Sequence, residues 1–195
     1  MSKNIDLRIL KTKKLIHDSF IELIDEKGFD KITINEIAER AQINRSTFYL
    51  HYADKYEWLN ETVDYAVNKI LALISPKSHV KDGHLEIESF HKDIKNILDI
   101  ISSEALLYKL ILKEKIVPDA YEKLIHIFKQ SFENAFPEET LIPKELFISL
   151  LLSLYIETIN WWLDSNMMYS SNYMSEQIIK LLTLGPITVS GLIYR

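Results

Sequence analysis

Apolar side chains recur at helical spacing along most of the chain. Between residues 6 and 27 they occupy one helix face, and Gly28 follows as a C-terminal stop. Similar stripes predict further helices over residues 54–75, 85–101, 103–114, 118–136, 144–166 and 174–184. Only four Gly and five Pro interrupt these stripes in 195 residues. The pattern therefore predicts an all-α protein.

One short stretch contains three helix starts. Thr33 with Glu36, and Asp54 with Glu57, each fit a capping box, in which a side-chain oxygen accepts from one backbone N–H and a Glu carboxylate from another. Asn44 gives a third, weaker start. Two short helices are therefore predicted, joined by a tight turn and followed by a longer helix. This is a helix-turn-helix, whose second helix has the size that enters a DNA major groove.

The second short helix is expected to have one buried and one exposed side. At about 100° per residue, Phe48 and Tyr52 point inward, where Ile37 and Ile43 can pack against them. The outward side carries hydroxyl groups, with a basic residue at its flank: Ser46, Thr47, Tyr49, Leu50 and Arg45. Hydroxyl groups suit phosphate contacts, and an Arg in the first turn can reach guanine edges.

Lys55 follows the Asp54 cap at the positive end of a predicted helix, where a cation is unfavourable by roughly 0.3–1 kcal/mol. A bound phosphate would reverse that effect, because the helix N-terminus and the Lys both attract anions. The alternative is that Lys55 is only a solvated surface residue.

Residues 9–59 resemble the DNA-binding domain of the TetR/AcrR family of bacterial transcriptional regulators. The resemblance rests on ITINEIAERAQINRSTFYLHYADKYEWL, with its IA-x-x-A spacing, its T-F-Y-x-H-Y run and the following D-K-x-x-x-L. One departure is Gln42, where the family usually has Gly. A left-handed non-Gly residue costs on the order of 1 kcal/mol, so we expect a slightly altered turn.

The resemblance implies a homodimeric, all-helical repressor whose larger C-terminal domain binds a small molecule. We therefore predict a helix-turn-helix DNA-binding domain over residues 1–55 and a helical effector-binding and dimerisation domain over residues 56–195. Together with the cap Asn44, the positions at which family members touch DNA give the predicted DNA-binding set: Thr33, Asn35, Asn44, Arg45, Ser46, Thr47, Tyr49, His51 and Lys55. Tyr49, His51 and Lys55 match phosphate-contacting positions, whereas Arg45 and Ser46 match positions that can meet bases.

The charge is unevenly distributed. The net charge is −5, but residues 1–60 are neutral overall, with ten basic and ten acidic groups, while residues 61–195 carry 13 basic and 18 acidic groups. Residues 1–14 hold five basic groups and one acid, which fits an arm that releases counterions from DNA. The alternative is a solvated tail. Because the whole domain is neutral, we predict modest non-specific affinity.

The segment 144–166 is apolar on nearly every face of its predicted helix. Such a helix must be buried on all sides, so one side is expected to meet a partner chain. The last two helices of each protomer would then form a symmetric four-helix interface. The predicted effector pocket combines aromatic residues with one acid: Tyr108, Tyr155, Glu157, Trp161 and Trp162. Alternatively, Glu157 faces solvent or pairs across the dimer, and the aromatic residues are core.

No sequence pattern indicates an enzyme. There is no Gly-rich phosphate loop, no HExxH and no credible Ser-His-Asp order, so we expect no catalytic residue, metal or cofactor. His79, His84 and His91 lack helical metal-ligand spacing, and a solvated loop over residues 75–84 is preferred. With no Cys, no signal-peptide pattern and a longest charge-free apolar run, 146–156, too short to span a bilayer, the protein is expected to be cytoplasmic.

The predicted function is transcriptional regulation by a homodimeric repressor, which an unknown small-molecule effector releases from a palindromic operator. The alternative is a family member of the coactivator type, which acts through a protein partner. A body without a cavity of ~300 Å³ or more would favour that alternative.

Overall fold

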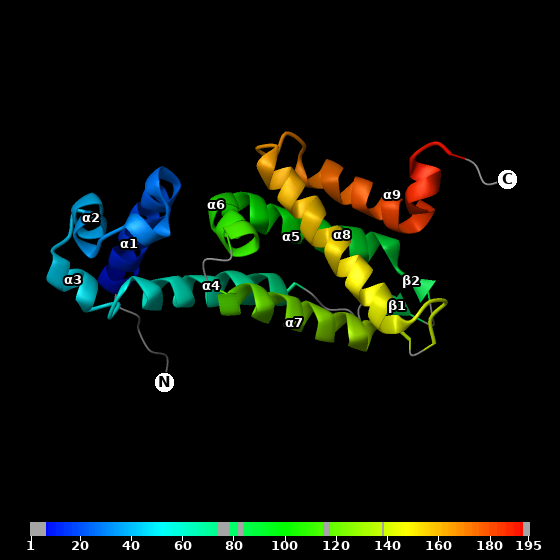
Figure 1. The fold of residues 1–195 in the computed structure, drawn as a ribbon, viewed down its shortest axis with the longest axis horizontal. Coiled ribbons are helices and arrows are strands. Elements are labelled where there is room, and N and C mark those ends of the chain that lie inside the picture. Colours follow the sequence, from blue (N-terminus) through cyan, green and yellow to red (C-terminus); the bar gives the residue numbers. More distant parts are fainter. Residues whose placement is uncertain (1–6, 74–78, 82–83, 115–117, 138, 193–195) are drawn as a thin grey trace. The chain divides into compact units, whose positions relative to one another are not determined.

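The structure is a computed structural model that describes residues 7–73, 79–81, 84–114, 118–137 and 139–192. It divides into two compact units, residues 1–64 and 65–195. Helices dominate the described residues, as the periodicity predicts, and the all-α fold class is confirmed (Figure 1). The predicted division by function at residue 55 stays a prediction, because the two units are defined by packing and not by function.

The first unit has a small core to which four helices contribute side chains. Its elements are α1 (Leu7–Lys27), the 3-10 turn η1 (Phe29–Lys31), α2 (Ile34–Arg40), α3 (Arg45–Tyr49) and the beginning of α4 (Lys55–Leu71). Five side chains are completely buried: Ile16, Phe20, Ile37, Phe48 and Trp58. The rings of Phe20 and Trp58 meet edge to face, with centroids 3.9 Å apart. This core holds α2 and α3 in place by burial of apolar surface.

The second unit continues from the end of α4. It contains a two-stranded ladder, β1 (Val80–Lys81) and β2 (His84–Leu85), then α5 (Ile87–Ser103), α6 (Ala105–Lys109), a π-helical turn η3 (Leu110–Glu114), α7 (Pro118–Ala135), α8 (Lys144–Asp164) and α9 (Ser171–Val189). Helix α5 packs along α9, and α7 packs along α8 (Figure 1).

The described part of residues 75–84 contains a buried His and paired strands rather than the expected solvated loop. Residues 75–78 and 82–83 lie outside the described residues, but β1 and β2 pair antiparallel, with Val80 opposite Leu85. His79 is 7% exposed rather than solvated, because its ring reaches Asp93 on α5. Spacing along the sequence could not predict that contact.

The last helix extends beyond its predicted end at Gly185. Gly185 has φ 75° and ψ 161°, so the helix kinks there, and it resumes through Pro186 to Val189. Pro is well suited to the first turn of a resumed helix, where its missing N–H has no partner to lose.

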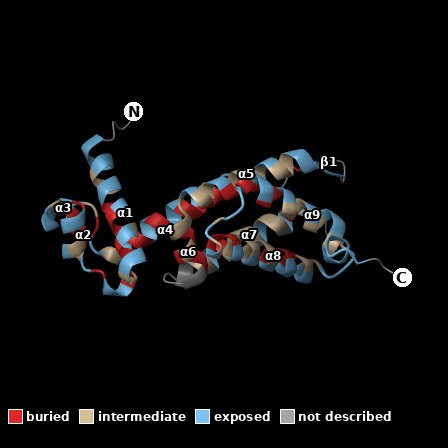
Figure 2. Cartoon of the chain, turned by 90° about the horizontal axis from the view of Figure 1, so that it is seen from above, coloured by how far each residue is buried: buried red, intermediate tan, exposed pale blue. Residues whose placement is uncertain are grey.

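Helix α8 is only partly buried within the chain (Figure 2). Ile148 and Trp162 face the core, while Leu146, Leu150 and Trp161 are about half exposed. By length and composition alone, α8 could cross a bilayer, with a mean hydropathy of 1.5 over its most apolar window. The core helices of soluble proteins meet the same criterion. Burial of the exposed apolar side of α8 against a partner chain stays a prediction.

Candidate functional site

The sidedness predicted for α3 is confirmed. Phe48 is 0% exposed and Tyr52 4% exposed, so both belong to the core. The opposite side of α3 is open: Arg45, Ser46, Tyr49 and Leu50 are exposed, and Thr47 is half-buried. A short helix fixed by its buried face and presenting polar groups outward has the form of a recognition helix.

Arg45 and Tyr49 form a pair one turn apart on the exposed side of α3. The Arg45 guanidinium lies over the Tyr49 ring, 5.4 Å from its centroid. One guanidinium nitrogen donates to the Tyr49 hydroxyl oxygen at 3.1 Å. This contact orders a long side chain before any ligand arrives, which lowers the entropy lost on binding.

The turn between α2 and α3 is a Schellman motif with Gln42 in the left-handed position. Gln42 has φ 54°. The amide of Ile43 donates to the Ala38 carbonyl at 2.9 Å, and the amide of Gln42 donates to the Glu39 carbonyl at 3.1 Å. These are the two bonds that define the motif. Gln42 therefore preserves the turn at a position where Gly carries less strain.

The capping box at the start of α2 is confirmed. The Thr33 hydroxyl oxygen accepts from the Glu36 amide at 3.4 Å, and the Glu36 carboxylate accepts from the Thr33 amide at 2.9 Å. Glu36 also pairs with Lys27 at the end of α1. The Lys27 ammonium, then the Thr33 amide and hydroxyl, lower the pKa of Glu36 to about 2. This carboxylate thus joins α1 to α2.

A second ion pair joins the other end of α2 to α1. Arg40 donates to both carboxylate oxygens of Glu26, and the Nη2–Oε2 distance is 2.8 Å. The Glu26 side chain raises the pKa of Arg40, and Arg40 lowers the pKa of Glu26. A bidentate pair fixes orientation as well as distance. Helix α2 is therefore held against α1 at both ends.

The start of α4 is capped, with one difference from the prediction. Asp54 Oδ1 accepts from the amides of Tyr56 at 2.8 Å and Glu57 at 2.9 Å. The Glu57 carboxylate accepts from the amide of Ala53 rather than from that of Asp54. At the start of α3, Asn44 occupies the cap position by backbone geometry, but its side chain makes no capping hydrogen bond.

Lys55 is held by the protein backbone. Its ammonium donates to the carbonyls of Phe29 at 3.1 Å, Asp30 at 3.0 Å and Ile32 at 3.2 Å. The same ammonium lies 4.7 Å from the centroid of the Phe29 ring. These three bonds occupy all three donors of the ammonium group. The description of Lys55 as a solvated residue is therefore wrong, and any phosphate contact would have to compete with these carbonyls.

Two basic residues of the N-terminal arm, Lys13 and Lys14, form ion pairs within the first unit. From Leu7 onward the segment is helix α1 rather than a tail. The Lys13 ammonium lies 2.6 Å from Glu61 and 5.0 Å from the centroid of the Tyr52 ring. Lys14 pairs with Asp18 on the same helix. Residues 1–6 lie outside the described residues.

The remaining predicted DNA-binding residues lie on the same run of short helices. Thr33, Asn35 and Asn44 are exposed, and His51 is half-buried. The structure thus places the predicted set between the start of α2 and the start of α4.

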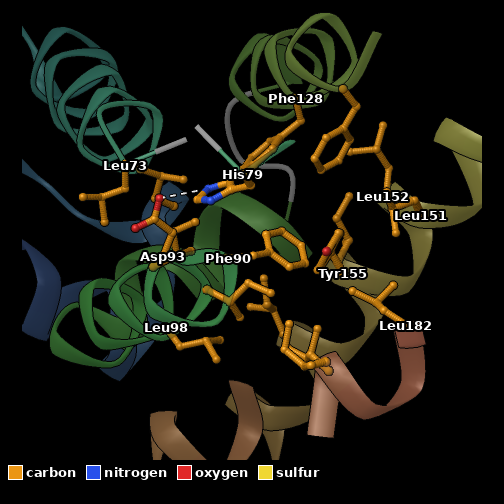
Figure 3. A pocket seen from close by; sticks show the side chains of 18 of the residues that line it. Leu73, His79, Phe90, Asp93, Leu98, Phe128, Leu151, Leu152, Tyr155 and Leu182 are labelled. Atoms are coloured by element: carbon orange, nitrogen blue, oxygen red, sulfur yellow. Dashed lines mark ion pairs between the residues drawn. The ribbon is translucent and has the colours of Figure 1, made fainter. Parts of the chain in front are cut away.

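The second unit contains an apolar cavity of about 310 Å³ (Figure 3). Tyr108 and Tyr155, two of the predicted pocket residues, line it. Glu157, Trp161 and Trp162 are not among its lining residues. Glu157 is exposed, Trp161 is 53% exposed, and Trp162 is core, with its indole N–H donating to the Tyr169 carbonyl at 2.8 Å.

Sequence reasoning missed most of the lining. Besides many Leu and Ile side chains, five Phe side chains line the cavity, from α5, from α7 and the residue after it, and from α8: Phe90, Phe128, Phe132, Phe136 and Phe147. Phe128, Phe132 and Phe136 recur every four residues, which is a signal for one inner helix face. Nothing in that spacing distinguishes a face that lines a cavity from one that fills a core.

Comparison with known proteins agrees with this architecture. Residues 16–62 match the family described as bacterial regulatory proteins, tetR family. Residues 88–184 match the family described as transcriptional regulator C-terminal region. The two matched regions cover most of the described helices.

Two related proteins span nearly the whole chain. The Staphylococcus epidermidis biofilm operon icaADBC HTH-type negative transcriptional regulator IcaR is 25% identical over 189 residues, which cover 88% of this chain and 97% of that protein. The Bacillus subtilis HTH-type transcriptional regulator YxbF is 21% identical over 184 residues, which cover 92% of this chain. The match covers 47% of YxbF, so the chain spans about half the length of that relative.

A solved structure has the same fold. The transcriptional regulator FadR from Bacillus subtilis, in complex with stearoyl-CoA, superposes with a TM-score of 0.62 at 16% identity, covering 88% of this chain and 98% of that one. At this identity the likeness concerns the fold. The sequence matches in both regions and the helix-turn-helix geometry together show that the chain belongs to the TetR family of bacterial transcriptional regulators.

Proposed function

We propose that this regulator is a homodimeric repressor that binds a palindromic DNA operator through α3 and is released by a small molecule bound in the second unit. The observation that carries the proposal is the exposed face of α3, where Arg45 is already ordered against Tyr49. An Arg at the start of a recognition helix can bond a guanine edge bidentately. Ser46 beside it can also meet bases, while Tyr49, His51 and Lys55 would position the helix on the phosphate backbone.

The dimer is supported by apolar surface on the last two helices. Leu146 and Leu150 on α8 are 50% and 55% exposed, and Leu184 and Ile187 on α9 are 55% and 39% exposed. Side chains of this kind at a protein surface mark an interaction site. A lipid bilayer is a poor alternative cover, because the charged Glu157 is exposed in the middle of α8. A second copy that uses the same two helices would cover the exposed apolar side chains of both α8 and α9. The proposed role on DNA also implies a cytoplasmic location.

The cavity favours a small-molecule effector over the coactivator-type alternative. A body without a cavity of ~300 Å³ or more would favour that alternative, whereas the second unit holds about 310 Å³. The FadR structure, with stearoyl-CoA bound, is an example of the same fold with a ligand that carries a long apolar acyl chain. Repression rather than activation is supported by the negative regulator IcaR. We accordingly assign DNA binding to residues 1–55 and effector binding and dimerisation to residues 56–195.

The test is a selection from random DNA duplexes with the purified full chain, followed by sequencing of the bound fraction. The proposal expects an enriched inverted repeat, because a two-fold symmetric dimer presents two copies of α3. Leu150→Glu, which places a charge on the exposed side of α8, should yield monomers in sedimentation and lose the repeat. Enrichment of a single half-site by the wild-type chain would contradict the dimer, and no enrichment would contradict sequence-specific binding.

A further inference from the structure

We propose that Glu157 on α8 pairs with Lys180 on α9 of a second copy of this chain, and that the two equivalent ion pairs fix how the copies are aligned. The inference rests on the proposed function, in which α8 and α9 form the dimer interface. It goes further by naming the contact that sets the alignment of the dimer.

The exposed sides of α8 and α9 are joined by a stack of aromatic rings. Trp161 on α8 and Tyr173 on α9 are both exposed. Tyr169, from the turn between these helices, stacks on both: its ring centroid lies 6.2 Å from that of Trp161 and 4.7 Å from that of Tyr173. Leu150 and Leu184, each about three turns away along its helix, are exposed as well. A second copy that covers this side of α8 therefore also meets α9.

Each helix carries a charge without a partner on its exposed side, and the two charges have opposite signs. Glu157 and Lys180 are exposed, and neither side chain has a hydrogen-bond or ion-pair partner among the described residues. Glu176 lies one turn before Lys180, but its carboxylate accepts from the Asn172 side-chain amide at 2.8 Å. The Lys180 ammonium thus remains available to a carboxylate from another chain.

The two charges have matching apolar neighbours. Each has an exposed apolar side chain seven residues before it and another four residues after it. These are Leu150 and Trp161 on α8, and Tyr173 and Leu184 on α9. Spacings of seven and four residues keep side chains on one face of a helix. When α8 lies parallel to α9 of a second copy with charge facing charge, apolar side chains therefore also face each other before and after the ion pair.

Two-fold symmetry makes the pairing reciprocal. Both copies use the same surface, so a contact from Glu157 to Lys180 is made twice. A charge that is covered without a partner loses hydration that nothing replaces. Contact of each helix with its own copy would bring Glu157 against Glu157, or Lys180 against Lys180, and like charges at an interface repel. Packing of α8 on α9 of the second copy is the arrangement that covers the apolar side chains and pairs both charges.

The test reverses the two charges, singly and together, in the full chain. We expect the wild type to sediment as a dimer, and Glu157→Lys and Lys180→Glu each to weaken dimerisation about a hundredfold, because like charges then meet at both contacts. The chain with both changes should recover the wild-type dissociation constant to within about tenfold. Unchanged dimerisation of both single variants would overturn this inference and leave the proposed dimer standing. A wild-type monomer would overturn both.

A mixture of the two single variants gives an independent readout. One variant has only positive charge at positions 157 and 180 and the other only negative charge, so the mixed dimer has opposite charges at both contacts. An affinity tag on the Glu157→Lys chain should therefore retain the untagged Lys180→Glu chain, although each variant alone is monomeric. Mixing does not rescue a chain that is misfolded. Failure of both the mixture and the double variant to dimerise would show that the two charges do not face each other.

Charge reversals on α7 are the matched controls. Glu133→Lys and Lys129→Glu make the same changes in net charge at exposed residues outside the last two helices. They should leave the dissociation constant of the dimer unchanged. Weakening equal to that of Glu157→Lys and Lys180→Glu would show a general charge effect and overturn the pairing.

Neutral variants decide the question if a charge-reversed chain does not fold. Glu157→Gln and Lys180→Gln each leave one covered charge without its partner, whereas the chain with both changes leaves none. The double variant should therefore lose no more affinity than either single variant. Losses that add up in the double variant would overturn the pairing, since independent sites behave in that way.

Discussion

The hydroxyl of Tyr108 on α6 donates to the backbone carbonyl of Ala66 on α4 at 3.1 Å. Burial is the main cause that raises the pKa of this hydroxyl, with the Glu104 carboxylate adding to it, so the donor proton is retained. Tyr108 also lines the cavity, and the adjacent Lys69–Glu104 ion pair joins α4 to the N-cap residue of α6 at 2.8 Å. One side chain therefore touches both the candidate effector site and the backbone of α4.

Tyr108→Phe should lower the free energy of unfolding by about 0.5–1.5 kcal/mol, the usual net value of one buried hydrogen bond. The ring remains in the cavity wall, so only the hydrogen bond to α4 is lost. Urea unfolding checks the change in stability. Tyr65→Phe is the control, because its ring is 60% exposed on α4 and the same hydroxyl is removed from the surface. A Tyr108→Phe chain as stable as the control would contradict a structural role for the bond.

Lys55→Met should lower the free energy of unfolding by about 1–3 kcal/mol, because three backbone carbonyls lose a charged donor. Lys31→Met removes the same charge from an exposed neighbouring residue and should change stability little. DNA affinity, measured by fluorescence anisotropy on the selected operator, separates the two roles of Lys55. A large loss of affinity with no loss of stability would assign the ammonium to the phosphate backbone instead.

Arg45→Ala should change which operator sequences are preferred, with about 1–3 kcal/mol less discrimination at one base pair of each half-site. Repeating the random-duplex selection with this variant checks the prediction. Tyr49→Phe is the informative companion, since it keeps the ring under Arg45 and removes the hydroxyl that Arg45 bonds. It should weaken binding to all sequences alike. If Arg45→Ala gives the wild-type enriched repeat, Arg45 does not read bases.

Local signals explain which features the sequence could predict. The Thr33–Glu36 box depends on atoms three residues apart, and the burial of Phe48 and Tyr52 follows from their spacing on one helix. The contacts of Lys55 reach back at least 23 residues along the chain, and His79 is buried where its ring meets Phe90 and Asp93 of α5. These depend on the tertiary fold, for which periodicity carries no information.

The cavity is a second feature that the periodicity of the sequence could not predict. Phe128, Phe132 and Phe136 have the spacing of an ordinary inner helix face, and the pattern is identical whether the space opposite them is filled or empty. The exposed Trp161 and the buried Trp162 are adjacent aromatic residues, and only the packing of α8 assigns one to the surface and the other to the core. The volume of a cavity is set by side chains from several helices at once, so it appears only in the structure.

The Glu36 carboxylate should make the first unit sensitive to acid. Its pKa in the folded state is about 2, against an ordinary value of 4.5, mainly because of Lys27. A lowered folded-state pKa contributes stability that is present above the ordinary value and is lost as the pH falls toward the folded value. The stability difference between the wild type and Glu36→Gln should therefore shrink as the pH is lowered from 4.5 toward 2. Urea unfolding at several pH values checks this, with Glu39→Gln on the same helix as control; a difference independent of pH would exclude linkage to Glu36.

Gln42→Gly should stabilise the helix-turn-helix, because Gln42 holds φ at 54° in the turn between α2 and α3. Removing the side chain relieves roughly 1–2 kcal/mol of left-handed strain, while the freer unfolded chain offsets about 0.4–1 kcal/mol of that gain. The net expectation is a rise of about 0.5 kcal/mol in the free energy of unfolding. Gln42→Ala is the control, because it keeps the Cβ atom and hence the strain. Equal stability of the Gly and Ala variants would show that Gln42 is not strained, and a Gly variant with lower DNA affinity would show that the Gln42 side chain takes part in binding.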